Sequence, residues 1–368
     1  MKKKNLCKTL VKTMCIVLGI LILALLAYIV YLYASYYRIE DNQELVVEAP
    51  VDDTTTGAAA VLATDTEYSA VTYNIGFGAY LPDYSFFMDG GTSSWAESPE
   101  TVQYAINGAG ELVKSLDPDF ALIQEIDLDS TRSYHTNEYE MLRQNLSGYT
   151  TVFAQNYDSA FLFYPFTQPH GSSKSGLGLF SKYPVTSALR RSFPISTSFS
   201  KFFDLDRCYS VSRIPVDNGN ELVIFNLHMS AYGNSDAIRK GQIEMLCNDM
   251  AKEYGAGNYV LCGGDFNHDL KASEEDTESC ESWAFPFPRT ELPEHFAFCL
   301  DLLSTEEQAA LWNSARNADM EYVPGVTYTV TLDGFIISDN IECLSYENVN
   351  TGYSYSDHDP VKVEFMLR

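Results

Sequence analysis

Six apolar segments of the sequence begin or end with a carboxylate, a carboxamide or an imidazole. One of them, at residues 259–262, is followed by Gly263 and Gly264 and then by Asp265 and Asn267. Glycines let the backbone turn sharply where a buried strand leaves a sheet. Side chains two residues apart point to the same side of an extended chain. The sequence therefore predicts that Asp265 and Asn267 form part of a polar site at a strand end.

The other five segments supply polar side chains at comparable places. These side chains are Asn74, Glu125, His228, Asp333, Asp357 and His358. Taken singly, each has an ordinary explanation as a turn former, a helix cap or a surface charge. Because six segments share the feature, we interpret the set as one functional site.

The elements that must position these residues are mostly strands. Strands are predicted at residues 69–75, 120–124, 150–153, 176–180, 208–215, 221–227, 259–262, 334–338 and 361–365. Ser98 followed by Pro99 opens a helix, residues 236–254 form a second one, and Ser304 with Glu307 makes a capping box for a third. Many strands with few helices favour sheets packed face to face and flanked by helices.

The N-terminal residues predict a membrane segment. The basic residues 1–12 precede an uncharged run at residues 13–37. As a helix this run spans roughly 37 Å, more than the hydrocarbon core of about 30 Å. It is longer than the apolar region of a cleaved signal peptide and ends in tyrosines typical of the membrane interface, so a retained anchor is favoured. We expect a single-pass cell-membrane protein whose residues after Arg38 lie outside the cytoplasm.

The composition of the chain after the apolar run predicts a stalk followed by one acidic domain. Residues 38–66 are rich in Asp, Glu, Thr and Ala and are expected to form a stalk, and residues 67–368 follow as one large catalytic domain. Beyond Arg38 the chain holds 18 basic and 50 acidic side chains, a formal charge of −32. Such a surface repels polyanions, so no stable nucleic-acid partner is expected.

The cysteines and the remaining histidines carry weaker signals. The eight cysteines show no metal-type spacing. Cys280 and Cys299 flank a loop-rich stretch, and whether they pair in an oxidising compartment is left open. His135, His170, His268 and His295 match no motif and are expected in loops.

A set of short motifs covers residues 71–365 in a fixed order. The motifs are TYNI, IQEID, GLGLFSKYPV, FNLHMS, GGDFN, LDGFIIS and SDHDPV. They resemble the endonuclease/exonuclease/phosphatase superfamily, which contains pancreatic-type deoxyribonucleases, neutral sphingomyelinases and inositol-polyphosphate phosphatases. GGDFN together with SDHDPV is the most specific pair. The resemblance implies a four-layered αββα sandwich, two mixed sheets flanked by helices, and metal-dependent cleavage of phosphate esters.

The resemblance also implies the residues that hold metal and phosphate. Glu125 is the expected ligand of Mg²⁺ or Mn²⁺, with Asn74 beside it and Asp357 contributing. Oxygen ligands without thiolates suit these ions rather than zinc. Arg132 and Arg207 are the cations expected to clamp the substrate phosphate.

The remaining residues of the set are expected to perform the proton transfers. Asp265 and Asn267 would orient or deprotonate the attacking water. His358, held by Asp333, would bind the phosphate or act in acid/base catalysis, and His228 is a candidate acid for the leaving group.

The sequence thus predicts a membrane-anchored, outward-facing, Mg²⁺-dependent phosphoesterase that hydrolyses a small or lipid-linked phosphodiester. An extracellular endonuclease or exonuclease is the first alternative, since cations close to the site can suffice to bind nucleic acid. A catalytically inactive binding domain of the same fold is the second.

Overall fold

The computed structural model describes residues 2–52, 61–202, 206–230, 236–273 and 284–368. Two compact units are present, Met1–Arg38 and Ile39–Arg368. The first unit is the single helix α1 (Lys2–Ser35). Its residues Cys7–Ser35 are long and apolar enough to cross a membrane, a property that a signal sequence near an N-terminus shares.

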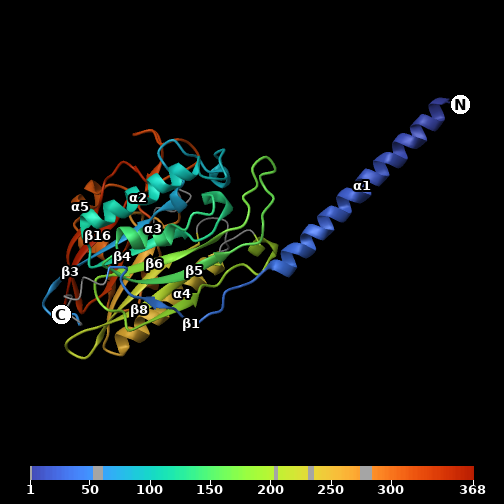
Figure 1. The fold of residues 1–368 in the computed structure, drawn as a ribbon. Coiled ribbons are helices and arrows are strands. Elements are labelled where there is room, and N and C mark those ends of the chain that lie inside the picture. Colours follow the sequence, from blue (N-terminus) through green and yellow to red (C-terminus); the bar gives the residue numbers. More distant parts are fainter. Residues whose placement is uncertain (1, 53–60, 203–205, 231–235, 274–283) are drawn as a thin grey trace. The chain divides into compact units, whose positions relative to one another are not determined.

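The second unit is built on two mixed sheets of seven strands each (Figure 1). The first sheet has the order β1 (Gln43–Glu44), β7 (Ser187–Ser192), β8 (Cys208–Pro215), β9 (Glu221–His228), β10 (Tyr259–Asp265), β14 (Asp333–Ser338) and β11 (Phe296–Phe298). Strand β10 runs parallel to β9 and antiparallel to β14. Asp265 is therefore the register partner of His228 on one side and of Asp333 on the other.

The second sheet carries the other half of the predicted site. Its order is β15 (Ile341–Asn348), β16 (Val361–Leu367), β3 (Glu67–Asn74), β4 (Phe120–Asp127), β6 (Lys174–Ser181), β5 (Thr150–Asp158) and β2 (Val47–Glu48). Strands β3 and β4 are parallel, which places Asn74 beside Gln124. A separate two-stranded sheet joins β12 (Ala315–Arg316) to β13 (Thr329–Val330).

Helices cover the outer faces of the sandwich. Figure 1 shows α2 (Pro99–Leu116) and α3 (Glu138–Asn145) on one side of the sheets and α4 (Asp236–Gly255) on the other. The Ser98 side chain caps α2 by accepting a hydrogen bond from the Thr101 backbone amide at 3.1 Å. The apolar face of α2 packs against β3 and β4, where Val102 and Ile106 share one buried cluster with Tyr73.

A buried polar bridge crosses the core between the two sheets. The apolar core around it includes Leu122 of β4 and Leu227 of β9, both fully buried in one cluster. Gln124 Nε2 of the second sheet donates to Asn226 Oδ1 of the first at 2.8 Å, and Asn226 Nδ2 donates to the carbonyl of Gly178 at 3.0 Å. Because a buried amide is costly unless it is hydrogen-bonded, this pair fixes one relative position of the sheets.

The predicted αββα architecture is confirmed, and each of the nine predicted strands is present. The helix after Ser98, the long helix at α4 and the capping box that opens α5 (Thr305–Ala310) are confirmed as well. Part of the segment expected to form a stalk, at residues 43–48, pairs with both sheets through β1 and β2. Cys299 is buried with a free thiol, whereas Cys280 lies outside the described residues.

Candidate active site

Asn74, at the end of β3, joins carboxylates that come from the two different sheets. Its Nδ2 donates to Glu125 Oε1 at 3.2 Å and to Asp265 Oδ2 at 3.0 Å. Its Oδ1 accepts from the backbone amide of Gly76 at 3.0 Å. Asn74 thus orients the two carboxylates, and ligation of a metal through its oxygen would require the amide to rotate.

Glu125 reaches the site because β4 is irregular at this residue. Its φ is +56°, a left-handed value that is uncommon for a side chain other than glycine. The register of β4 against β6 shifts between Ile123 and Ile126, as in a β-bulge. Bulges redirect a side chain, and backbone strain of this kind is found at functional sites. Glu125 is also the more open of the two bridged carboxylates, with 23% of its side chain exposed against 2% for Asp265.

Asp265 lies at the centre of the cluster. Its Oδ2 is 3.5 Å from His228 Nε2 and 3.9 Å from His358 Nε2. Its Oδ1 accepts from the backbone amide of Asn267 at 2.8 Å, and Asn267 Nδ2 donates to the Met229 carbonyl. The backbone at Gly264 passes so close to Leu227 that a Cβ there would lie 2.1 Å from its carbonyl oxygen. Only glycine permits this approach of β10 to β9.

A hydrogen-bonded chain orients His358. Its Nδ1 lies 2.7 Å from Asp333 Oδ2, and Ser314 Oγ donates to the same oxygen at 2.7 Å. The Ser314 hydroxyl in turn accepts from the Asp333 backbone amide. All three side chains are buried, so the imidazole is held with Nε2 directed towards Asp265.

Burial and neighbouring charges set the protonation of the three central groups. Burial, opposed by the His358 charge, raises the pKa of Asp265 to about 7. Burial alone would lower the pKa of His358, but the Asp333 carboxylate outweighs it and holds that pKa well above its usual value. Burial and the charge of Arg207 lower the pKa of His228 far below its usual value. At neutral pH the site therefore pairs a charged His358 with a neutral His228.

Asp357 lies on the side of the cluster that belongs to the second sheet. Burial raises its pKa, His358 and Arg316 oppose the shift, and Glu125 adds to it. A Cβ at Gly76, whose φ is +53°, would meet Asp357 Oδ1 at 3.1 Å. The neighbouring Ser356 donates its hydroxyl to the Asn74 carbonyl at 2.8 Å, which ties this loop to the end of β3.

The two arginines expected at the site differ in their partners. Arg132 forms a bidentate ion pair with Asp127, through Nε at 3.0 Å and Nη2 at 2.9 Å, and its guanidinium lies 3.6 Å from the ring centroid of Phe77. Arg207 is also buried, but within the described part of the chain its Nε and Nη1 have no hydrogen-bond partner. Within the described residues, Arg207 is thus the arginine of the two with side-chain donors available for a phosphate.

The cluster has the chemistry of a cation site. Asp265, Asp333 and His358 each offer a ligand atom, and these atoms lie within 4.8 Å of one another. Glu125 and Asp357 add two further carboxylates. Asp333 Oδ1 is buried, and among the described residues it has no hydrogen-bond partner. An acidic group of this kind, with oxygen donors and no thiolate, fits a divalent cation.

Several supporting residues were not singled out from the sequence. Ser314 positions Asp333 by hydrogen bonds to its carboxylate and from its backbone amide, and Ser356 joins the loop at Asp357 to the end of β3. Asp127 holds Arg132, and Arg316 donates to the carbonyls of residues 80 and 81 while its backbone amide donates to the Asp357 carbonyl. Ser314 and Arg316 stand in no recognisable motif. Asp127 was visible in the IQEID motif, five residues before an arginine.

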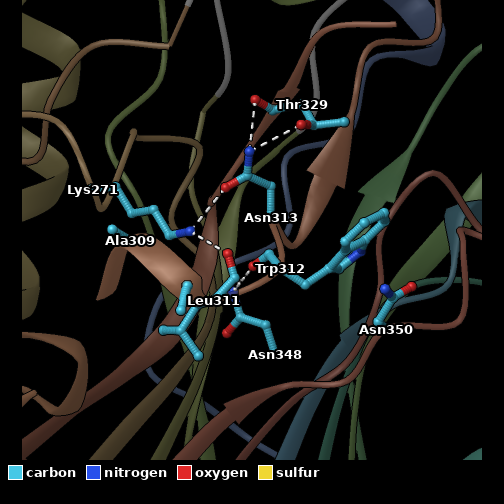
Figure 2. A pocket seen from close by; sticks show the side chains of 9 residues that line it. Lys271, Ala309, Leu311, Trp312, Asn313, Thr329, Asn348 and Asn350 are labelled. Carbon is cyan, nitrogen blue, oxygen red and sulfur yellow. Dashed lines mark hydrogen bonds between the residues drawn. The ribbon is translucent and has the colours of Figure 1, made fainter. Parts of the chain in front are cut away.

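The structure also has a separate hollow, which Figure 2 shows from close by. Its lining consists of Lys271, Ala309, Ala310, Leu311, Trp312, Asn313, Thr329, Asn348 and Asn350. None of the expected site residues is among them. Trp312 Nε1 donates to Asp359 Oδ2 at 2.8 Å, so the wall of the hollow is joined to the SDHDPV loop. We place the chemistry at the strand ends, where the titratable groups converge, and not in this hollow.

The sandwich and the carboxylate–imidazole cluster at its strand ends together define a metal-dependent phosphoesterase. The sequence agrees, since residues 71–302 match the model of the Endonuclease/Exonuclease/phosphatase family. The chain belongs to this family, and it is a hydrolase acting on phosphoric ester bonds. No match was found among curated proteins.

Solved structures with the same fold are distant in sequence. An endonuclease/exonuclease/phosphatase from Beutenbergia cavernae is 14% identical with a TM-score of 0.56, over 82% of this chain and 72% of that chain. A member from Bacteroides vulgatus is 15% identical with a TM-score of 0.54, over 83% and 100%. TDP2 from D. rerio, complexed with a single-strand DNA product, is 14% identical with a TM-score of 0.54, over 82% and 99%. At these identities the likeness establishes the fold alone.

Proposed function

We propose that this protein is a membrane-anchored, outward-facing, Mg²⁺-dependent phosphodiesterase acting on a small or lipid-linked substrate. The anchor is α1, which is long and apolar enough to span a bilayer. Its N-terminal turns contain the lysines of the chain's first twelve residues, and Tyr31 and Tyr33 near its end suit the membrane interface. Such an anchor keeps the catalytic unit beside lipid head groups.

The observation that carries the proposal is the meeting of Glu125 and Asp265, from different sheets, on one amide nitrogen of Asn74. With Asp357 and Asp333 nearby, this set would hold a hard divalent ion through carboxylate oxygens. Bound there, Mg²⁺ would neutralise the charge of the phosphate group. Of the residues that the family resemblance implies for the ion, Glu125 and Asp357 belong to this carboxylate group, which supports the proposal.

The protonation states of Asp265, His358 and His228 suggest their roles in the reaction. Asp265, with a pKa of about 7, is suited to orient the attacking water with Asn267 and to accept its proton. His358, kept charged by Asp333, would bind a phosphate oxygen, and Arg207 is near enough to influence His228 and would add a second positive contact. A neutral His228 would donate a hydrogen bond to the leaving oxygen rather than a full proton.

The test uses the full chain in detergent micelles with bis-(p-nitrophenyl) phosphate. We expect hydrolysis with added Mg²⁺, loss of hydrolysis with EDTA, and recovery when Mg²⁺ or Mn²⁺ is restored in excess. Hydrolysis that continues after chelation and dialysis would exclude the metal-dependent mechanism.

A nuclease is the second candidate, and the fold shared with TDP2, solved with a single-strand DNA product, favours it. The formal charge of −32 on the exported part argues against tight binding of long nucleic acids. Plasmid and single-stranded DNA degradation, measured at two salt concentrations, separates the candidates. Rapid degradation that weakens steeply with salt supports a nuclease, whereas turnover of phospholipid head groups with intact DNA supports the first proposal.

A catalytically inactive binding domain is the third reading. The complete set of carboxylates, amides and imidazoles at the strand ends argues against it, because a binding role does not require proton-transfer groups with shifted pKa values. Absence of turnover across a panel of phosphodiesters and phosphomonoesters, with Mg²⁺ bound, would favour it.

A further inference from the structure

One loop of the catalytic unit exposes several aromatic side chains together. This aromatic loop, residues 159–173, connects β5 to β6. Phe163 is 49% exposed, Tyr164 63% and Phe166 85%. Met88, in the neighbouring η3 (Phe87–Asp89), is 52% exposed. Exposed apolar side chains are ordinary when scattered, but a contiguous group marks an interaction surface.

The aromatic loop is held in place at its base. Leu162 and Gly171 exchange backbone hydrogen bonds at 2.9 and 3.0 Å. Trp95 Nε1 donates to the Pro169 carbonyl at 2.7 Å, and the Thr131 amide donates to the Ser172 carbonyl at 2.8 Å. Hydrogen bonds from two other segments therefore hold the base of the loop, while its tip is exposed to solvent.

The loop also lacks charge, in a unit that is otherwise highly charged. Residues 159–173 contain no Asp, Glu, Lys or Arg, whereas the exported part as a whole carries −32. Burial lowers the pKa of His170 to about 3, so this histidine is neutral as well. A neutral aromatic tip suits the interfacial zone of a zwitterionic bilayer, where aromatic side chains are enriched.

Packed aromatic rings connect the tip to the segment that follows β3. The ring centroids of Tyr164 and Phe87 are 5.9 Å apart, and Phe87 packs on Phe86 at 4.9 Å. The ring centroids of Phe86 and Phe77 are 6.2 Å apart. Phe77 directly follows Gly76, whose backbone amide donates to Asn74 Oδ1. The packed rings therefore link the tip to the segment that directly follows Asn74.

We propose that the aromatic loop inserts its tip into the interface of the bilayer that α1 spans, and so presents the active site to phosphodiesters embedded in that bilayer. The inference rests on the proposed function, because it takes the apolar helix of the same chain as a retained anchor. The anchor keeps the catalytic unit near lipid at all times, and the tip then fixes which part of the unit faces the lipid.

The test measures contact with lipid and needs no catalysis. The full chain is reconstituted into phosphatidylcholine vesicles with or without phosphatidylcholine brominated at carbons 6 and 7. A tryptophan is introduced at the tip by Phe166→Trp, and the control is Leu302→Trp, at a residue that is 56% exposed on η8 (Cys299–Leu302). We expect brominated lipid to quench the added tryptophan of Phe166→Trp at least about twofold more than that of the control. Equal quenching of the two overturns the inference.

A second arm separates this inference from the proposed function. In Phe163→Ser/Phe166→Ser, hydrolysis of a phosphodiester lipid in vesicles should fall about tenfold, while hydrolysis of bis-(p-nitrophenyl) phosphate stays unchanged. Equal losses on both substrates would overturn the inference. Quenching at the tip without hydrolysis of any phosphodiester would refute the proposed function and leave lipid insertion standing. If brominated lipid does not quench the tryptophan of Phe166→Trp but its emission wavelength shifts with protein concentration, the tip instead contacts a second copy of the chain.

Discussion

His358 Nδ1 lies 2.7 Å from Asp333 Oδ2, and neither side chain is open to solvent. The pair joins the loop before β16 in one sheet to the start of β14 in the other. An exposed pair of the same type and length, His295 with Asp339, lies elsewhere on the surface. The two pairs allow a matched comparison of a histidine inside the cluster with one outside it.

We expect Asp333→Asn to lower kcat by roughly 10² to 10⁴, the usual contribution of a positioned acid or base. The asparagine keeps the shape of the side chain but cannot hold His358 charged. The measurement is kcat on bis-(p-nitrophenyl) phosphate, with thermal unfolding as the check on folding. Asp339→Asn is the control and should leave kcat within about twofold. Similar rates for the two variants would remove His358 from the mechanism.

Glu125→Gln should reduce turnover at least about 10²-fold, because it removes a charged oxygen from the expected ion site. The affinity for Mn²⁺, measured by calorimetry, should fall in parallel. Glu111→Gln, whose carboxylate is exposed and pairs with Lys114 on α2, is the control. Unchanged Mn²⁺ affinity in Glu125→Gln would place the ion elsewhere in the cluster.

The two buried arginines should respond differently to substitution by methionine. Arg132→Met leaves the Asp127 charge buried without its partner, so the free energy of unfolding should fall by about 3–5 kcal/mol. Arg207→Met removes a buried charge whose Nε and Nη1 have no hydrogen-bond partner among the described residues, so stability should be retained while KM for the phosphodiester rises several-fold. Urea unfolding and steady-state kinetics measure both effects. A large loss of stability in Arg207→Met would show that Arg207 is held by a structural partner.

Acid should destabilise the catalytic unit partly through two buried loop histidines. The pKa of His170 is lowered to about 3 and that of His268 to about 4, in both cases mainly by burial. Below about pH 6.5 these two histidines bind protons in the unfolded chain but remain neutral in the folded chain. The free energy of unfolding should therefore fall as pH drops from 6.5 towards 4, with a slope of up to about 1.4 kcal/mol per pH unit for each histidine.

The substitution His170→Phe isolates one of these contributions. The ring of His170 packs near Phe86 and Phe87, so phenylalanine retains the aromatic contact and removes the titration. Urea unfolding at pH 7.5, 6.0 and 5.0 should show a shallower loss of stability in the variant. Parallel slopes for His170→Phe and the unaltered chain would refute the assignment.

The sequence predicted the elements whose hydrophobic pattern is strong. Buried strands such as β9 and β10 are continuous apolar runs, and α2 carries both a cap and an apolar face. Strand β7 was missed because SALRRS is polar and contains two arginines. Strand β15 was missed because several of its side chains face solvent. β15 is an edge strand and β7 lies next to the short edge strand β1, so both are stabilised by their neighbours rather than by their own pattern.

The site was predicted as a set of residue types but not as a geometry. Motif order identified Glu125, Asp265 and His358 as members of one cluster, and the structure brings them together through His228 and Asn74. The left-handed backbone at Glu125 had no sequence signal, because the bulge depends on the register of β4 against β6. The different environments of Arg132 and Arg207 also depend on tertiary contacts.

The Gln124–Asn226 bridge has a consequence for biosynthesis. Because each sheet contributes only part of the catalytic set, a nascent polypeptide in which one sheet has formed contains no competent centre. Hydrolysis can begin only after the second sheet has docked and the amides have paired across the interface. A chain in which only one sheet has formed is therefore inactive, because the catalytic set is complete only when the two sheets have docked.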